Sequence, residues 1–598
     1  MRVRFPSPAP INPMTPHAKH YALCCATMLA ILATLNMPGL TAGSRTERAA
    51  RRTPASKSPS NQVSMSGKSS PFDNVREYIH AAWGHLTRSV DVCKTLEDVK
   101  TKGEPILYLP AEFGEPPDVK AMAERCHVRV KHLPAKITKP GELDSKKIGP
   151  EGLLYLPNPY IVPGGQFNEM YGWDSYFIIL GLLRENRLAL AKGMVDNFFF
   201  EIEHYGGVLN ANRTYYLTRS QPPFLTSMIL AVYDAEKAAG RLDKAWLEKG
   251  YDYARRDYEQ WTSPPHLAGD TGLSRYFGRG DGPVPEILED PSHYYREVAE
   301  YFLMHPGNNH GQMVSADAQH PTASATGQIF DLFVCGSKVT TVANAKDCQE
   351  HHVALTSDYY KGDRSMRESG FDITSRFGPY GDETHDYAPT CLNSLLYKTE
   401  LDLAEISTLL GKKSEAQQWE QQAMHRRANI DKYLWDAKAG LFYDYNFQTR
   451  TRSSYEFATT FYPLWAGLAT KEQAKAVDSK ISLFEEPGGL VTSRNDSGAQ
   501  WDYPYGWAPL QLLAVEGLRR YGYAADADRI SYKFLSMILE DFRTERHIRE
   551  KYDVVTRESV THIRAGYVTN QIGFGWTNGV FLELLHKLAP EQLARLTN

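Results

Sequence analysis

A helical spacing of apolar residues, repeated through most of the chain, limits the possible folds more than any other feature. Long segments carry apolar residues three and four positions apart, and short loops rich in glycine and proline separate them. This spacing places apolar side chains along one face of a helix. The expected helices cover residues 188–205, 224–239, 244–261, 392–410, 414–434, 455–468, 471–483, 508–521, 524–544 and 576–587. Strand-like runs such as 106–109 and 153–156 are few and short, so the sequence predicts a mainly α domain.

The first 74 residues differ from this helical part. Basic residues precede an apolar run at 21–35, and small residues follow at about position 42. This order is typical of an export signal, and the run is shorter than the roughly twenty residues that span a bilayer. Residues 43–74 are rich in Ser, Arg and Lys and cannot bury a core. The sequence therefore predicts a signal peptide at 1–42, a disordered tether at 43–74, and an exported, periplasmic or secreted protein with no other membrane association.

Charge and aromatic content narrow the class of ligand. The chain has 67 Lys and Arg against 71 Asp and Glu, so its charge gives no reason to expect a nucleic acid or an anionic membrane as partner. It also has 35 tyrosines and 10 tryptophans. Sugars present flat C–H faces that stack on aromatic rings, so a neutral carbohydrate suits this composition, although most aromatic residues in any chain belong to the core.

Five cysteines follow the predicted signal, which is an odd number and so excludes complete intramolecular pairing. Cys335 and Cys348 would close a short loop, but the sequence does not show which cysteines meet. No cysteine and histidine spacing is typical of zinc, and we expect no metal site.

Two loop segments place tryptophan next to aspartate. They are PGGQFNEMYGWDSY at residues 163–176 and QWDYPYGWAP at residues 500–509. A tryptophan offers a stacking face and an aspartate accepts hydrogen bonds from adjacent hydroxyls, which together suit a hexose pocket. A single such pair is also typical of a buried tryptophan followed by a helix-capping aspartate. Two pairs favour a sugar site.

These segments resemble the two signature motifs of the trehalase family of glycoside hydrolases. Four more motifs occur with them, and the order of all the motifs is that of the family. They are NANRTYYLTRSQPP at 210–223, ESGFDITSR at 368–376, EKYD at 550–553 and GFGWTNG at 573–579. The resemblance implies an (α/α)6 toroid that hydrolyses α,α-trehalose, a small disaccharide, to two glucose molecules with inversion, and it implies no cofactor. On this basis we expect an N-terminal extension at 75–160 that packs on a catalytic toroid at 161–598.

The resemblance also assigns the acid and the base. Asp372 in ESGFD matches the general acid, and Glu550 in EKYD matches the general base. Inversion requires one carboxyl to protonate the leaving oxygen while another activates water on the opposite face, at a separation of roughly 6.5–9.5 Å. The neighbours of Asp372 are apolar and those of Glu550 are basic, which favours these roles. Without the family order, ESGFD would be interpreted as a helix cap and EKYD as a surface turn.

Further positions align with sugar-contacting residues of the family. They are Gln166, Phe167, Trp173, Asp174, Asn210, Arg219, Ser220, Gln221, Glu286 and Gly370. An arginine fork and paired amides suit vicinal hydroxyls. Arg219 could equally form a structural ion pair with Asp174 or Glu286, and the sequence leaves both interpretations open.

Three departures from the family pattern concern substrate contacts. Gln166 and Val284 stand where arginines are expected, and no glutamate occurs at the matching place near Gly566. Either other arginines (Arg275, Arg279 or Arg564) substitute, or the pocket takes a related α-glucoside. Because both catalytic motifs are kept, we predict an active inverting hydrolase. The alternatives are an exo-α-glucosidase of the same fold with another substrate and a non-catalytic sugar-binding relative.

Overall fold

The computed structural model describes residues 72–97, 103–286, 291–316, 325–341, 348–566 and 568–597. The predicted signal at 1–42 and nearly all of the predicted tether at 43–74 lie outside these residues. None of the helices in the described ranges combines the length and apolar character needed to cross a bilayer.

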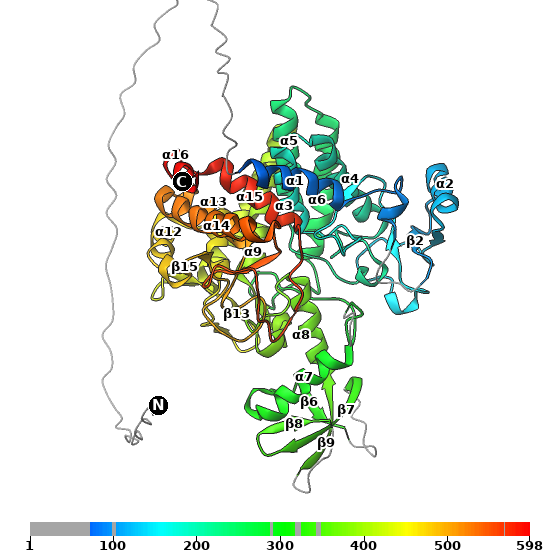
Figure 1. The fold of residues 1–598 in the computed structure, drawn as a ribbon, viewed down its shortest axis with the longest axis vertical. Coiled ribbons are helices and arrows are strands. Elements are labelled where there is room, and N and C mark those ends of the chain that lie inside the picture. The colour runs from blue at the N-terminus through cyan, green and yellow to red at the C-terminus, as the bar shows by residue number, and fades with distance from the viewer. Residues whose placement is uncertain are drawn as a thin grey trace, which may run out of the picture. The chain divides into compact units, whose positions relative to one another are not determined.

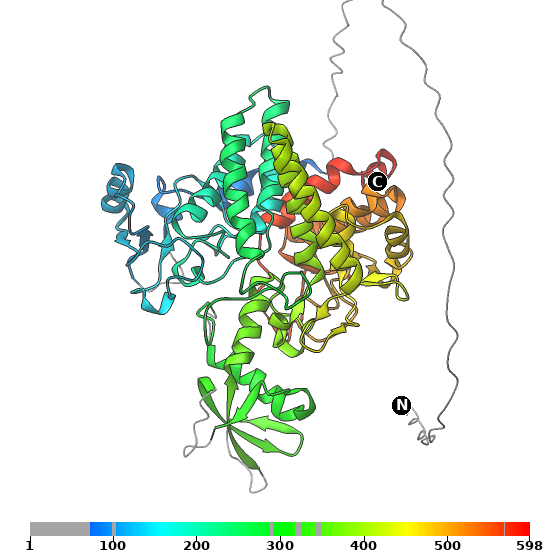
Figure 2. The same cartoon turned by 180° about the vertical axis from the view of Figure 1, so that it is seen from behind.

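A closed ring of helices forms the centre of the structure. Each helix of the ring contacts the next, and the last contacts the first. Within the described residues these inner helices are α3 (Asp174–Arg184), α5 (Leu225–Ala238), α9 (Thr390–Leu410), α11 (Tyr462–Trp465), α13 (Ala508–Arg520) and α15 (Gly575–Lys587). Six helices closing on themselves form the inner layer of an (α/α)6 toroid, and the predicted fold is confirmed. Figures 1 and 2 show this helical region from two sides.

A second layer of helices packs outside the ring. Helix α1 contacts α15, α4 contacts α3 and α5, α6 contacts α5 and α9, α10 contacts α9, and α14 contacts α13 and α15. The outer helices are α1 (Asp73–Leu86), α4 (Leu188–His204), α6 (Lys244–Trp261), α10 (Lys413–Tyr433), α12 (Lys471–Asp478) and α14 (Ala524–Glu545). Most of them match the ranges predicted from periodicity within a few residues.

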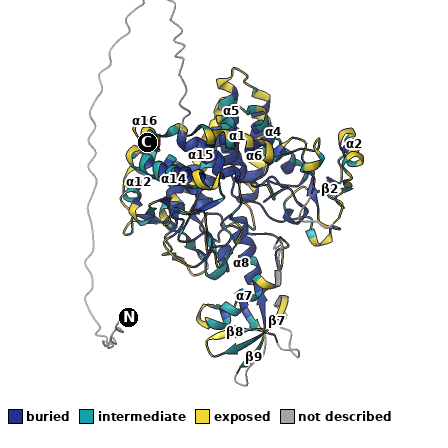
Figure 3. Ribbon diagram, viewed as in Figure 1, coloured by how far each residue is buried: buried dark blue, intermediate teal, exposed yellow. Residues whose placement is uncertain are grey.

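Burial distinguishes the two layers, as Figure 3 shows. Every residue of α15 from Gly575 to Leu585 is buried, whereas α10 buries only Ala416, Ala423, Arg426 and Ile430. A helix enclosed on all sides is apolar all round, and an outer helix keeps a polar face. Helices α3 and α15 pack backbone to backbone, because a Cβ atom on Gly181 would lie 2.6 Å from the Cα atom of Gly579.

The region around α11 differs from the prediction. The expected helix at 455–468 is a 3-10 helix η7 (Ala458–Phe461) followed by the one-turn helix α11. The expected helix at 471–483 is α12 followed by the 3-10 helix η8 (Ile481–Leu483). Pro463 lies in the first turn of α11, the position where a residue without an N–H is tolerated, and so marks a helix start inside the predicted segment.

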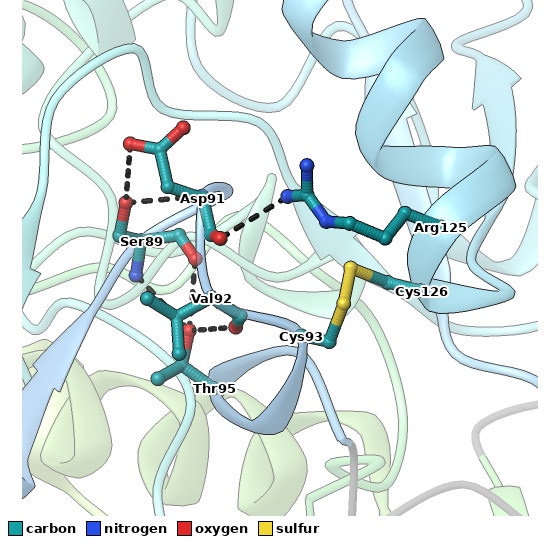
Figure 4. Close-up of a disulfide and its surroundings, with 7 residues drawn as sticks. All are labelled: Ser89, Asp91, Val92, Cys93, Thr95, Arg125 and Cys126. Carbon is teal, nitrogen blue, oxygen red and sulfur yellow. Dashed lines mark hydrogen bonds between the residues drawn. A yellow bond between two sulfur atoms is a disulfide. The ribbon is translucent and has the colours of Figure 1, made fainter.

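Before the ring, a small parallel sheet has the strand order β3 (Arg129–His132), β2 (Ile106–Leu109), β4 (Leu153–Leu154). The helix α2 (Pro117–Cys126) connects β2 to β3, and its last residue forms a disulfide with Cys93 (Figure 4). The Nη2 atom of Arg125 donates a 3.1 Å hydrogen bond to the carbonyl of Asp91 beside this disulfide. A second disulfide joins Cys335 and Cys348, the pair that the sequence placed in a short loop. Cys391 is free and buried.

Between α6 and α8 (Ser357–Glu368) lies an inserted subdomain that the sequence analysis missed. It consists of helix α7 (Pro291–Met304) and an antiparallel sheet of order β6 (Met313–Ser315), β9 (Gln349–Thr356), β7 (Ala325–Cys335), β8 (Lys338–Thr340). Its own apolar cluster includes Val298, Phe302, Leu332 and Leu355. Figures 1 and 2 show that α8 leads from this insert back to the helical region.

Candidate active site

Loops that enter the inner helices carry most of the predicted site residues. Trp173 immediately precedes α3, residues 219–221 precede α5, residues 500–502 precede α13, and the segment that pairs with Glu550 precedes α15. Because the inner helices are neighbours in a closed ring, these entry loops bring sequence-distant residues to one place.

Aromatic rings from these loops form one cluster around Trp173. Its ring centroid lies 5.6 Å from Phe371, 5.9 Å from Trp501 and 5.6 Å from Trp576. Gly370 lies against the same indole: its φ is +76°, and a Cβ atom there would be 2.9 Å from Cε2 of Trp173. A glycine is therefore required for this close approach. The cluster brings Trp173, Gly370 and both Trp–Asp segments together.

Three carboxyl groups influence one another beside this cluster. Asp174 is 4% exposed, and burial raises its pKa well above the usual range. The charges of Glu550 and of Asp372 raise the pKa of Asp174 further. Burial also raises the pKa of Asp372 to about 6, although Arg367 and Arg219 oppose this shift. The two candidate catalytic carboxyls thus lie in one electrostatic neighbourhood, with Asp372 in a setting that favours its protonated form.

A hydrogen-bond chain links the two candidate catalytic residues. The side chain of Gln500 donates from Nε2 to the carbonyl oxygen of Asp372, and its Oε1 atom accepts a 2.9 Å hydrogen bond from Nζ of Lys551. That Nζ atom lies 3.6 Å from Oε2 of Glu550. Lys551 is fully buried, so burial lowers its pKa, and the neighbouring charge of Glu550 opposes this effect. Gln500 and Lys551 therefore link the backbone of Asp372 to the side chain of Glu550.

The strand that carries Glu550 is fixed from two sides. The backbone N–H of Glu550 donates a 3.0 Å hydrogen bond to the carbonyl of Gln571, just before α15. The indole N–H of Trp576 donates a 3.3 Å bond to the Glu550 carbonyl. On the other side, β18 (Lys551–Asp553) pairs with β17 (Tyr505–Trp507). The side chain of Glu550 is only 12% exposed.

A buried ion pair joins two other predicted residues. The Nη2 atom of Arg219 lies 2.5 Å from Oε1 of Glu286, and both side chains are almost fully buried. Burial disfavours the charge of Glu286, but the charges of Arg219 and Arg367 outweigh burial and lower its pKa. The Arg219 guanidinium also lies 4.9 Å from the ring centroid of Tyr216. Of the two ion pairs that the sequence left open for Arg219, the structure contains the one with Glu286.

The predicted polar residues of the 210–223 segment hold the entry loops together. The Nδ2 atom of Asn210 donates to the carbonyl of Ser220 at 3.3 Å, and the hydroxyl of Ser220 donates to the carbonyl of Val208 at 2.5 Å. The side-chain carbonyl of Gln221 accepts a 3.0 Å bond from the N–H of Trp173. These residues are therefore buried next to Trp173.

Gln166 and Phe167 lie at the edge of this group. Gln166 is exposed, whereas Phe167 is half-buried with its ring centroid 5.5 Å from Tyr171 and 6.4 Å from Phe574. Arg88 holds their loop by donating to the carbonyl of Phe167 at 2.8 Å. The structure thus places Phe167 among site aromatics but shows no contact of Gln166 with the other predicted residues.

The structure also shows where the other two departures from the family pattern lie, at Val284 and near Gly566. Val284 is fully buried in the apolar cluster of the inserted subdomain. Gly566 lies against Gln500, because a Cβ atom at position 566 would be 2.8 Å from Cγ of Gln500. Val284 therefore packs in the core of the insert. Gly566 contacts Gln500, a residue of the hydrogen-bond chain.

The arginines proposed as substitutes have other partners. Arg275 donates to the carbonyls of Pro265 at 2.9 Å and His385 at 2.8 Å. Arg564, which is largely exposed, pairs with Asp496 at 3.1 Å. The Nη2 atom of Arg279 lies 3.5 Å from Nδ1 of His266.

Arg367, which the sequence analysis missed, is the arginine beside the candidate acid. Its Nη1 atom lies 3.8 Å from Oδ2 of Asp372, and its side chain is 4% exposed. The available signal was its position at the end of α8, immediately before the ESGFD motif.

The raised pKa of Asp372 should make the stability of the folded protein depend on pH. Its pKa is raised from 3.8 to about 6 in the folded protein, so its contribution to stability is present below the unfolded pKa and is lost as pH rises through the folded value. At pH 8 the buried charge costs up to roughly 3 kcal/mol, at 1.36 kcal/mol per pKa unit. We expect Asp372→Asn to raise the melting temperature at pH 8 and to change it little at pH 4. Equal melting temperatures of variant and wild type at both pH values would contradict this assignment.

Comparisons with known proteins identify the family. A family model described as trehalase matches residues 56–589. The cytosolic neutral trehalase of Saccharomyces cerevisiae is 37% identical over 561 residues, covering 84% of this chain and 69% of that protein. The cytosolic neutral trehalase of Neurospora crassa is 36% identical and covers 84% of this chain and 71% of its own length. A solved neutral trehalase from Saccharomyces cerevisiae superposes with a TM-score of 0.69 at 32% identity, covering 88% of this chain and 96% of that one.

These relatives correct the predicted location and confirm the resemblance. Both curated relatives are named as cytosolic proteins, which contradicts the expectation of an exported chain. The signal peptide predicted at residues 1–42 and the periplasmic or secreted location are therefore wrong. The prediction rested on an apolar run after basic residues, and other N-terminal segments share this composition. The family model and the relatives together cover most of the sequence, and the chain belongs to the trehalase family.

Proposed function

We propose that this chain hydrolyses α,α-trehalose to two glucose molecules by a single inverting displacement, with Asp372 as general acid and Glu550 as general base. The observation that carries the proposal is the chain of contacts from Asp372 through Gln500 and Lys551 to Glu550. It supports a fixed placement of the two residues in one site, and inversion requires their carboxyls to lie roughly 6.5–9.5 Å apart with room for a water.

The settings of the two carboxyls suit different roles. Burial keeps Asp372 protonated at higher pH than an ordinary aspartate, so it can donate a proton to the departing glycosidic oxygen. The Oε2 atom of Glu550 lies 3.6 Å from Nζ of the buried Lys551. In the proposed step, Glu550 takes a proton from water as the water attacks the anomeric carbon, and Asp372 protonates the oxygen of the leaving glucose.

The chemistry of the predicted sugar contacts suits recognition of a sugar beside these groups. The aromatic cluster at Trp173 supplies stacking faces, and the pair of Arg219 with Glu286 supplies charged hydrogen-bonding groups close to Asp372. Asp174, Asn210, Ser220, Gln221 and Gly370 lie in the same group of loops, and we keep Gln166 and Phe167 as predicted contacts at its edge. The relatives, which are named trehalases, favour trehalose over the exo-α-glucosidase and the non-catalytic alternatives.

The anomer that is released tests both substrate and stereochemistry. Purified protein is incubated in separate reactions with trehalose, kojibiose, nigerose and maltose, and proton NMR follows the first minutes of each reaction. With inversion, one of the two glucose molecules from trehalose appears first as the β anomer. We expect fast turnover of trehalose with this early β-glucose signal. Initial release of α-glucose alone, or preferential turnover of another disaccharide, would contradict the proposal.

A further inference from the structure

The inserted subdomain contacts the catalytic loops through one buried carboxylate. Asp363 lies on α8 and is fully buried. Its Oδ1 atom accepts a 3.2 Å hydrogen bond from the hydroxyl of Tyr294, and its Oδ2 atom accepts a 2.9 Å bond from the hydroxyl of Tyr295. Both tyrosines belong to helix α7 of the insert. Two adjacent residues of the insert thus converge on one carboxylate of α8, the helix that leads back to the helical region.

Asp363 in turn holds the arginine beside the proposed acid. The Nε atom of Arg367, four residues later on α8, donates a 3.2 Å hydrogen bond to Oδ1 of Asp363. Its Nη1 atom reaches to 3.8 Å from Oδ2 of Asp372, and its guanidinium lies 5.3 Å from the ring centroid of Tyr294. The guanidinium is therefore held between two carboxyls and against an aromatic face, a geometry that a flexible side chain does not keep without partners.

Tyr295 also holds the loop that carries Glu286. The backbone N–H of Val284 donates a 2.9 Å hydrogen bond to the hydroxyl of Tyr295. One hydroxyl therefore accepts from this loop and donates to Asp363, so it ties the two together. Arg364 on α8 holds the same loop by donating to the carbonyls of Gly282 at 2.7 Å and Pro283 at 2.6 Å. Glu286, two residues after Val284, pairs with Arg219.

We propose that the insert positions the catalytic site: Tyr294 and Tyr295 fix Asp363, Asp363 sets Arg367 against Asp372, and Tyr295 fixes the loop of Glu286. These three residues are positioning residues that act through Arg367 and Glu286, and the inference rests on the proposed hydrolysis of trehalose. A merely structural role would give the insert a stable core but would leave the chemistry of Asp372 unaffected.

The groups around Asp363 and Asp372 determine in which direction the pKa of Asp372 should shift when Asp363 is replaced. The ionisable and charged residues that face Asp363 are Tyr294 and Tyr295 from α7 and Tyr359, Tyr360, Arg364 and Arg367 from α8. Those that act on Asp372 or are acted on by it are Arg367, Arg219, Glu286, Asp174 and Lys551. Removing the charge of Asp363 takes away a carboxylate that competes with Asp372 for the Arg367 guanidinium, which favours ionisation of Asp372.

The test compares pH profiles of kcat/KM on trehalose for the full-length wild type, Asp363→Asn, Tyr295→Phe and Tyr301→Phe. The alkaline limb of kcat/KM reports the general acid of the free enzyme. Because Asp363→Asn lowers the pKa of Asp372, its alkaline limb should move to lower pH by about 0.5–1 unit. Tyr295→Phe should raise KM several-fold with a smaller change in kcat, because the loop of Glu286 loses its anchor.

Tyr301→Phe is the matched control, since Tyr301 lies on the same helix and its hydroxyl accepts a 2.8 Å hydrogen bond from the exposed side chain of Asn308. It should keep both the wild-type limb and the wild-type KM. If Asp363→Asn lowers activity at all pH values with an unchanged limb, or if Tyr295→Phe keeps the wild-type KM, the positioning role is wrong. A wild type that does not hydrolyse trehalose would instead overturn the proposed function.

Discussion

Asp372→Asn is expected to lower kcat on trehalose by about 10²–10⁴-fold, the usual contribution of a general acid. Asparagine keeps the size of the side chain but has no proton to give to the leaving oxygen. Glucose release under saturating trehalose provides the measurement. The control is Asp270→Asn, which removes a carboxylate that is 80% exposed and is not one of the candidate site residues. It should keep wild-type kcat.

A substrate with a better leaving group separates the acid from other roles of Asp372. Fluoride leaves from α-glucosyl fluoride with little need for protonation. Asp372→Asn should therefore hydrolyse α-glucosyl fluoride at a rate much closer to that of the wild type than its rate on trehalose. An equal loss on both substrates would show that Asp372 does not act as the proton donor, even if it is essential.

Glu550→Gln is expected to cost a similar factor of about 10²–10⁴ in kcat, but on both substrates. The water must be deprotonated whichever group leaves, so the better leaving group of α-glucosyl fluoride should not restore the rate of this variant. The opposite behaviour of the two variants on α-glucosyl fluoride is what distinguishes acid from base. Rates are measured as fluoride release with an ion-selective electrode and as glucose release from trehalose.

The matched control for the base is Glu558→Gln, an exposed glutamate on the turn that follows the same strand. It should leave both rates unchanged. If Glu550→Gln kept wild-type turnover of trehalose, the base would have to be another carboxyl, and buried Asp174 would be the first to test, because it responds to the charges of both Glu550 and Asp372.

Local patterns predicted the helices well, because each helix depends on neighbours three and four residues away. The predicted range 244–261 coincides with α6, and 508–521 differs from α13 by one residue. Closure of the ring depends on contacts between α3 and α15, which lie almost 400 residues apart in the chain, so it followed only from the family resemblance. The insert was missed because short strands such as β6 and β8 gain stability only from pairing with β9 and β7.

The site shows the same division between local and long-range information. Motifs identified Asp372, Glu550 and Trp173, whose surroundings the structure then supplies. The contact between Gln500 and Lys551 spans separate loops, and nothing in either loop alone indicates it. Val284 was interpreted as a lost sugar contact, whereas its side chain belongs to the core of an insert that the sequence did not predict. Arg367 was overlooked although it lies just before the ESGFD motif, because the sequence does not show that its side chain points toward Asp372.

The backbone contact between Gly181 and Gly579 joins the first and the last helix of the inner ring, which has a consequence for folding during synthesis. The inner ring begins with α3 and closes only when α15 packs against it, so the nascent chain must carry most of the apolar inner helices without their final neighbours. Glu550 is likewise anchored by Gln571 and Trp576, which emerge last. Long-range closure of this kind slows folding and leaves apolar surface exposed in the meantime. We therefore expect trehalose hydrolysis only after α15 has packed on α3, and truncations that remove α15 should abolish activity together with closure of the ring.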